Sequence, residues 1–417
     1  MAVVGNFTGD ERTAAVAAVG ANSPLIGLIV NLFIGIALGT NVVIANAIGC
    51  GDIKNVQKAV HTSVVVSVIG GALVAVIGEL AAAPILGLLN VPNDVFPLAL
   101  LYLRIYLLGM PVILLYNFEA AIFRSVGETK IPLIALATSG ILNVILNLFF
   151  VAVLNMTVNG VAIATVISNA VSSALLYHRL RKISQYIRLE PKLMRVDLKI
   201  LKRILRIGLP AGIQSAVFAL SNIVIQSAIN SLGTVVMAAS SAAFNIEVIT
   251  YDILNSFSQA CTTFVGQNSG AGEYSRCKKT LLLCLLEGFA ALSAAIAVIL
   301  IFGKPLISVF NNDPEVIKTG YIRLVMIMLS HSFSLLYDVM SGYLRGFGIS
   351  LVPAILTMVG VCGVRIAWIK FVFPQSKTFS TIMAAYPISL SATTLLIFIA
   401  LLCYRPSKRF ARLQTEP

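Results

Sequence analysis

The sequence contains very little charge for its length. Among 417 residues, Asp, Glu, Lys and Arg make up 11%, and hydrophobic residues make up 58%. Soluble domains carry about 25% charged residues. The mean hydropathy of +0.93 is equally high. These values exclude an ordinary soluble domain and indicate a chain that lies in lipid.

Residues and motifs that support catalysis or metal binding are also scarce. The three histidines are not spaced as metal ligands, and the six cysteines never form a C-x-x-C pair, so neither a zinc site nor a disulfide framework is indicated. The sequence has no phosphate-binding G-x-x-x-x-G-K-[ST] loop and no G-x-S-x-G nucleophile elbow. We therefore expect a protein that is not an enzyme and that holds no metal or cofactor.

The net charge of +13 is concentrated beside apolar segments. Residues 179–206 contain ten Lys or Arg against two acidic residues, and the tail 405–417 is also basic. Basic loops next to membrane spans follow the positive-inside rule. We therefore expect a cytoplasmic linker (183–203), a cytoplasmic tail and no binding of nucleic acid.

Eleven apolar runs are long enough to cross a bilayer as helices, because about 20 residues span its hydrocarbon core. They cover roughly residues 21–48, 61–83, 96–121, 131–154, 160–180, 205–230, 236–264, 281–303, 318–342, 350–372 and 380–403. The short loops alternate between basic and non-basic, which places the start of the chain outside the cell. Two lobes are predicted, 1–182 and 204–404.

An internal repeat at a constant offset of 221 residues relates the two halves. The segment 49–52 matches 270–273, and 122–132 matches 343–353. The second match pairs Arg124 with Arg345, Gly127 with Gly348 and Pro132 with Pro353. Since matched loops share one predicted membrane side, we expect parallel repeats about the membrane normal and structural roles for these six residues. The counterpart of the span 205–230 would precede residue 1, so we expect a twelve-helix architecture that lacks its first helix.

Several segments carry a resemblance to a known family. They are VVGNFTGDERTAAVAAVG, IGCGDIKNVQKAVHTS, YNFEAAIFRSVGETKIP, LRIGLPAGIQSAVF, FVGQNSGAGE and GYLRGFG. Along nearly its whole length the chain resembles the prokaryotic branch of the multidrug and toxic compound extrusion (MATE) transporters. The resemblance implies a V-shaped pair of helical lobes that alternate access and export cationic, amphipathic compounds in exchange for Na⁺ or H⁺.

The resemblance also indicates a polar site in the first lobe. The family motif N-x-x-x-D-P falls on Asn143 to Leu148, so that Asn147 stands where relatives have an acid, and the family's A-T pair is kept as Ala164 and Thr165. The aspartate of the family's first helix would precede residue 1. We count no other carboxylate at mid-depth in this lobe and therefore expect ion coupling to depend on the second lobe.

Two polar stripes in the second lobe are candidates for ion or substrate binding, because ionisable groups inside spans are costly and are kept for function. One comprises Asp252, Asn255 and Gln259, and the other comprises His331, Ser334, Asp338 and Ser341. Each stripe has the spacing of one helical face. The alternative interpretation is a hydrogen-bonded cluster that only joins helices.

The other ionisable residues in the spans receive structural interpretations. Glu79, Arg104 and Lys370 are expected to reach the membrane interface, and Arg365 is expected to anchor its helix near the outer surface. Glu247 lies about 140° around the helix from Asp252 and should point elsewhere.

The sequence therefore predicts a multi-pass protein of the inner membrane, expected as a monomer, that exports small organic compounds by antiport. Two alternatives stay open. A lipid or polysaccharide flippase of similar architecture would be expected to carry more basic residues in its cavity. A non-transporting remnant would be compatible with the absence of a first helix.

Overall fold

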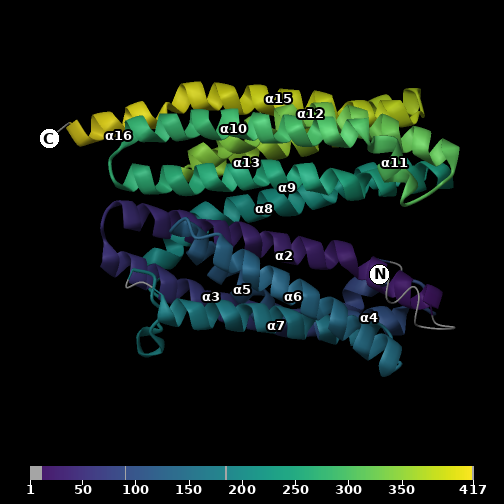
Figure 1. The fold of residues 1–417 in the computed structure, drawn as a ribbon, viewed down its shortest axis with the longest axis horizontal. Coiled ribbons are helices and arrows are strands. Elements are labelled where there is room, and N and C mark those ends of the chain that lie inside the picture. Colours follow the sequence, from purple (N-terminus) through teal and green to yellow (C-terminus); the bar gives the residue numbers. More distant parts are fainter. Residues whose placement is uncertain (1–11, 90, 184–185, 416–417) are drawn as a thin grey trace. The chain divides into compact units, whose positions relative to one another are not determined.

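The computed structural model describes residues 12–89, 91–183 and 186–415, and within these ranges it is helical and contains no strand. The chain forms two compact units (Figure 1). Unit 1 comprises the chain through Ile48 together with Asp52–Gly212, and unit 2 comprises Gly49–Gly51 and the chain from Ile213 onward. An all-helical membrane fold, predicted from hydropathy, is confirmed.

The helices of unit 1 run side by side (Figure 1). They are α2 (Arg12–Gly49), α3 (Ile53–Leu88), α4 (Phe96–Leu108), α5 (Met110–Ser125), α6 (Lys130–Leu148) with the π-helical η2 (Phe149–Val153), and α7 (Val158–Lys182). The short 3₁₀ helix η3 (Pro191–Leu193) precedes α8 (Leu198–Asn230), which begins in unit 1 and continues into unit 2.

The described part of unit 2 that follows α8 contains four long helices and several short helical segments. They are α9 (Thr234–Gly270), α10 (Tyr274–Ile301), α11 (Gly303–Ser308), α12 (Pro314–Gly346), α13 (Leu351–Thr357), α14 (Val364–Ala367), α15 (Phe379–Tyr404) and α16 (Pro406–Thr415). The π-helical segments η4 (Met358–Gly363) and η5 (Trp368–Val372) flank α14, and η6 (Phe373–Gln375) closes this span.

All eleven predicted spans are confirmed within the described ranges. Ten helices are long and apolar enough to cross a membrane, and the pair α4 and α5 forms the eleventh span with a bend of 48°. The bend falls at Gly109, and Pro111 follows it in the first turn of α5. Proline has no N–H and cannot bond to the carbonyl four residues earlier, so it explains the break in the helix.

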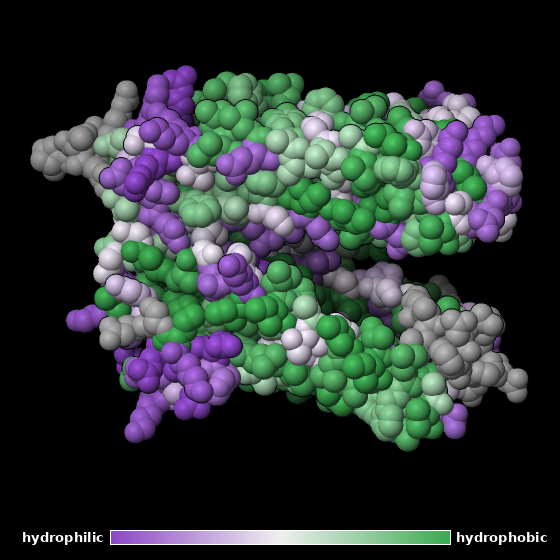
Figure 2. Space-filling view, in the orientation of Figure 1, coloured by the Kyte–Doolittle hydropathy of each residue, from purple (hydrophilic) through white to green (hydrophobic). Residues whose placement is uncertain are grey.

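The apolar residues that remain exposed identify the surface that meets lipid. Leu80, Leu88 and Ile141 are 78%, 81% and 65% exposed although they lie in membrane-length helices. Figure 2 shows hydrophobic residues along the middle of the helices and hydrophilic residues toward their ends. This distribution matches a bilayer, which solvates apolar side chains at its centre and polar ones at its faces.

The predicted linker packs against unit 1. Ile187 and Leu189 are 2% and 1% exposed and belong to the hydrophobic core of this unit. The N–H of Glu190 donates to His61 Nε2 at 3.0 Å, while His61 Nδ1 lies 2.6 Å from Gln57 O. These contacts require the His61 tautomer that carries its proton on Nδ1.

Asp197 joins the end of this linker to α3 and caps α8. Its N–H donates to Thr62 Oγ1 at 3.0 Å, and its carboxylate lies 3.2 Å from Lys58 Nζ. Oδ1 accepts the N–H groups of Lys199 and Ile200. The hydrogen bond from Ile200, assisted by Lys58, holds the pKa of Asp197 below its usual value.

The internal repeat appears as identical turns in the two units. Gly127 and Gly348 both have positive φ, of 81° and 78°. The N–H of Glu128 donates to Phe123 O at 3.1 Å, and the N–H of Ile349 donates to Leu344 O at 3.0 Å. These are matching helix C-caps at the predicted offset, at a position where glycine avoids the left-handed strain.

The same offset relates the other turns and helix starts. Gly51 and Gly272 have φ of 69° and 75°. The buried prolines Pro132 and Pro353 lie in the first turns of α6 and α13, where a helix needs no N–H donor. The repeat predicted from two short segments therefore extends to the helix boundaries of both units.

Candidate functional site

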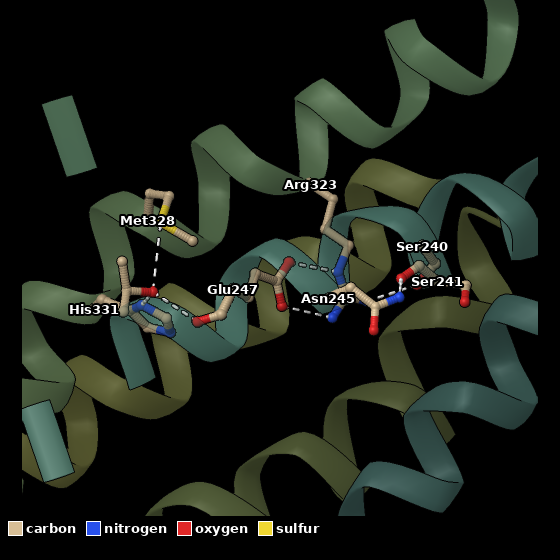
Figure 3. Close-up of polar contacts among 8 residues, drawn as sticks. Ser240, Ser241, Asn245, Glu247, Arg323, Met328 and His331 are labelled. Carbon is tan, nitrogen blue, oxygen red and sulfur yellow. Dashed lines mark hydrogen bonds and ion pairs between the residues drawn. The ribbon is translucent and has the colours of Figure 1, made fainter. Parts of the chain in front are cut away.

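A buried ion pair joins α9 and α12 in unit 2. Arg323 Nε lies 2.7 Å from Glu247 Oε1, and Arg323 Nη2 donates to Glu247 Oε2 at 2.8 Å. Arg323 Nη1 also donates to Ser240 Oγ at 2.7 Å (Figure 3). The two side chains are only 5% and 8% exposed. The planar guanidinium matches both carboxylate oxygens, which makes this a charge-assisted, geometrically specific contact.

The polar contacts continue along the same helix pair to His331. Thr250 Oγ1 donates a hydrogen bond to the backbone carbonyl of Glu247, one turn earlier, at 2.8 Å. It also lies 2.9 Å from His331 Nδ1. His331 is 8% exposed and Thr250 is fully buried. Figure 3 shows His331 and the Arg323 pair in one row between α9 and α12. This row, defined by Ser240, Glu247, Thr250, Arg323 and His331, is called the α9–α12 polar row below.

A second buried arginine lies beside this row. Arg365 in α14 is 4% exposed and donates from Nε to Ser389 Oγ at 3.1 Å. Its guanidinium lies 4.3 Å from the centre of the Tyr386 ring and 5.9 Å from that of Phe218. The guanidinium of Arg323 lies 5.9 Å from the same Tyr386 ring. Tyr386 therefore contacts two buried cations, an arrangement that its π face stabilises.

The residues of the two predicted stripes differ in burial. On α12, His331, Ser334 and Ser341 are buried and Asp338 is half-buried. On α9, Asp252 is exposed, while Asn255 and Gln259 are half-buried. Among the described residues no hydrogen bond joins one stripe to the other. As expected, Glu247 lies on a different face from Asp252, but no sequence pattern had indicated its partner Arg323.

The repeat arginines lie at equivalent turns but in different surroundings. Arg345 is buried, and its Nη2 donates to Gln214 Oε1 at 2.8 Å. It also interacts electrostatically with Asp338. Arg124 is half-buried, and its Nε is enclosed without a hydrogen-bond partner among the described residues.

The predicted polar residues of unit 1 form one network between α6 and α7. Asn143 Nδ2 lies 3.4 Å from Thr165 Oγ1 and 3.2 Å from Ser168 Oγ. Asn147 Nδ2 donates to Asn143 Oδ1 at 2.9 Å, while Asn147 Oδ1 is enclosed without a partner among the described residues. The structure thus brings together the three residues that the resemblance had indicated.

No role was expected for Glu119, which lies near the end of the predicted span 96–121. Glu119 in α5 is fully buried, and its Oε2 accepts a hydrogen bond from Ser173 on α7 at 2.9 Å. Its Oε1 has no partner in the part of the chain that the structure describes. Glu79 and Arg104, which were expected to reach the membrane interface, form an ion pair at 3.2 Å. Hydropathy cannot show such pairing, which depends on neighbouring helices.

The residues of these networks do not suggest a metal centre. Within the described residues, no three side chains of His, Cys, Asp or Glu are grouped closely enough to hold a metal ion. The arrangement offers instead hydrogen-bonding and charged groups between helices of a membrane protein.

Comparison with known proteins assigns the chain to a family. The MatE family model matches residues 1–149 and 210–369, which include parts of both units. The chain belongs to the MatE family. This MatE protein is 26% identical over 407 residues to the probable multidrug resistance protein YoeA of Bacillus subtilis, an alignment that covers 95% of the chain and 87% of the relative. It is also 25% identical over 322 residues to the FAD transporter of Shewanella oneidensis, covering 75% and 70% of the two chains.

Solved structures share the fold of this MatE protein. A MOP superfamily transporter from Pyrococcus furiosus, described as having a binding pocket of reverse polarity, gives a TM-score of 0.87 at 22% identity and covers 96% of this chain and 90% of its own. An outward-facing multidrug resistance MATE transporter gives 0.87 at 21% identity, covering 99% and 91%. The predicted family and fold class are therefore confirmed.

Proposed function

We propose that this protein is a secondary transporter that exports small organic compounds by alternating access, in exchange for H⁺ or Na⁺. The observation that carries the proposal is the α9–α12 polar row, buried between two membrane-length helices of a MatE fold. Charged groups inside spans are expensive and mark transport pathways. The multidrug resistance proteins among the relatives support a broad set of substrates, and the FAD transporter extends that set to a large anionic compound.

We further propose a multi-pass protein of the cell membrane that works as a monomer, with no enzymatic activity of its own. The linker and the tail would face the cytoplasm. The basic residues near Lys58 and Asp197 support this orientation, because cytoplasmic loops are enriched in Lys and Arg.

A flippase for lipid-linked or polysaccharide substrates is the second candidate. Such a protein was expected to carry more basic residues in its cavity than the sequence suggested. Arg323, Arg345 and Arg365 are buried within membrane-length helices of unit 2, and their positive charge supports this candidate.

Transport can be tested with the purified protein in liposomes of phosphatidylcholine. We expect efflux of the fluorescent cation ethidium when an inward gradient of H⁺ or of Na⁺ is imposed, and loss of efflux when ionophores collapse both. A non-transporting remnant would show no gradient-driven efflux. Movement of labelled lipid without movement of ethidium would favour the flippase.

A further inference from the structure

The buried charges of unit 2 do not balance. Three arginines in this unit, Arg323, Arg345 and Arg365, are at most 8% exposed. Two of these arginines interact with a carboxylate. Glu247 forms an ion pair with Arg323, and Asp338 interacts electrostatically with Arg345. A buried charge without an opposite charge is costly by several kcal/mol in proteins, so its retention calls for an explanation.

Arg365 is the cation without a carboxylate partner among the described residues. Its hydrogen-bonding and aromatic contacts there are the Nε hydrogen bond to Ser389 and the rings of Tyr386 and Phe218. A guanidinium carries five N–H donors. The two terminal nitrogens of Arg365 therefore keep donors in the bidentate arrangement that matches a carboxylate or phosphate.

Arg365 is buried, although the equivalent position of the repeat in unit 1 is exposed. Its counterpart in unit 1 at the offset of 221 is Val144, which is 55% exposed. Helix starts in the two units still match at this offset, Lys130 with Leu351 and Val158 with Phe379. The π-helical η4 precedes Arg365, whereas the equivalent residues 137–142 form regular α-helix. Each residue added by a π turn rotates the remainder of the helix by about 100°, and π segments are frequent at functional sites.

The neighbours of Arg365 suit a ligand that combines an anion with an aromatic group. The Tyr386 ring lies against the guanidiniums of both Arg365 and Arg323, and the Phe218 ring centre lies 5.9 Å from the guanidinium of Arg365. Rings in this position can stack with a planar ligand while the guanidinium binds its acidic group.

We propose that Arg365, Tyr386 and Phe218 form a subsite for the acidic group of an aromatic organic anion carried by this transporter. The inference rests on the proposed transport function and names a substrate class for it. The acidic group, a carboxylate or a phosphate, binds the terminal nitrogens of Arg365, and the aromatic body lies against Tyr386.

Binding of two probes of opposite charge tests the subsite directly. Carboxyfluorescein and ethidium are titrated into purified wild type, Arg365→Gln and Arg365→Lys in phosphatidylcholine nanodiscs, with fluorescence anisotropy as the readout. We expect Arg365→Gln to weaken the binding of carboxyfluorescein at least about tenfold, because a charge-assisted hydrogen bond is lost. The same variant should bind ethidium more tightly. Arg365→Lys keeps the positive charge but loses the bidentate arrangement of the guanidinium, so it should bind carboxyfluorescein with intermediate affinity.

Folding is monitored in the same samples. Arg365 has no carboxylate partner among the described residues that would be left unpaired, so Arg365→Gln should melt at or above the wild-type temperature. Arg323→Gln leaves the Glu247 carboxylate buried without its cation and should melt at a lower temperature. An Arg365→Gln protein that is stably folded and binds carboxyfluorescein as the wild type does would overturn the inference. So would displacement of carboxyfluorescein by phosphatidylglycerol added to the nanodiscs, because the occupant would then be a lipid headgroup.

The transport assay separates this inference from the proposed function. If ethidium efflux proceeds and carboxyfluorescein binding is absent, the subsite is wrong and the transporter stands. If carboxyfluorescein binding depends on Arg365 but neither probe moves under any gradient, the subsite stands and the transport proposal fails.

Discussion

Breaking the ion pair between Glu247 and Arg323 should destabilise unit 2 strongly. The pair is joined by two short contacts and is nearly excluded from solvent. Arg323→Gln leaves the Glu247 carboxylate buried without its cation, and Glu247→Gln leaves the guanidinium without its anion. Removing one partner of a buried pair costs about 3 to 5 kcal/mol. For a unit of this size we expect Tm to fall by roughly 6 to 20 °C.

The double variant distinguishes a pair from two independent residues. If the loss comes from the stranded charge, Glu247→Gln with Arg323→Gln should recover part of the stability, so that the two effects are clearly non-additive. Trp368 provides the assay, because it is the only tryptophan and its Nε1 donates to Thr381 O at 2.8 Å within unit 2. Its fluorescence during heating reports the melting of this unit. Single variants that melt within 2 °C (about 1 kcal/mol or less) of wild type would refute the reasoning.

Three further predictions concern transport, turn geometry and topology. Asp252→Asn and Asp338→Asn should each abolish gradient-driven efflux of ethidium at unchanged expression, because an amide cannot titrate. Normal efflux in both variants would indicate that the two polar stripes have only a structural role. Gly127→Ala should lower the free energy of unfolding by about 1 to 2 kcal/mol, because the φ of Gly127 is 81°. Gly140→Ala is the control: it lies in a regular helix and should not destabilise the protein, and an added Cβ meets no neighbour at either glycine. Equal melting temperatures of the two variants would contradict this prediction. In a variant without exposed native cysteines, a cysteine placed at Arg188 should react with an impermeant maleimide only after the cells are permeabilised. Labelling in intact cells would show that the predicted topology is inverted.

The sequence alone determined the class of protein, its spans and its repeat. A bilayer imposes a length and an apolar composition on each span, so hydropathy located all eleven without tertiary information. The left-handed turns at Gly127 and Gly348 could also be anticipated, because a glycine at a helix C-cap is a local requirement that recurs in both halves. The network of Asn143, Asn147 and Thr165 followed from matched motifs.

Only the tertiary structure decided which charges are paired. Glu247 and Arg323 are 76 residues apart in the sequence, and Glu119 meets Ser173 from another helix. Helical periodicity gives the face on which a residue lies, but it does not say which helix covers that face. Arg365 was expected to anchor its helix near the outer surface, and the structure adds that it is buried against Tyr386. It follows a π-helical segment that a regular helical period could not anticipate. Pairing and burial depend on contacts between distant segments, whereas a span depends on its own residues and the lipid around it.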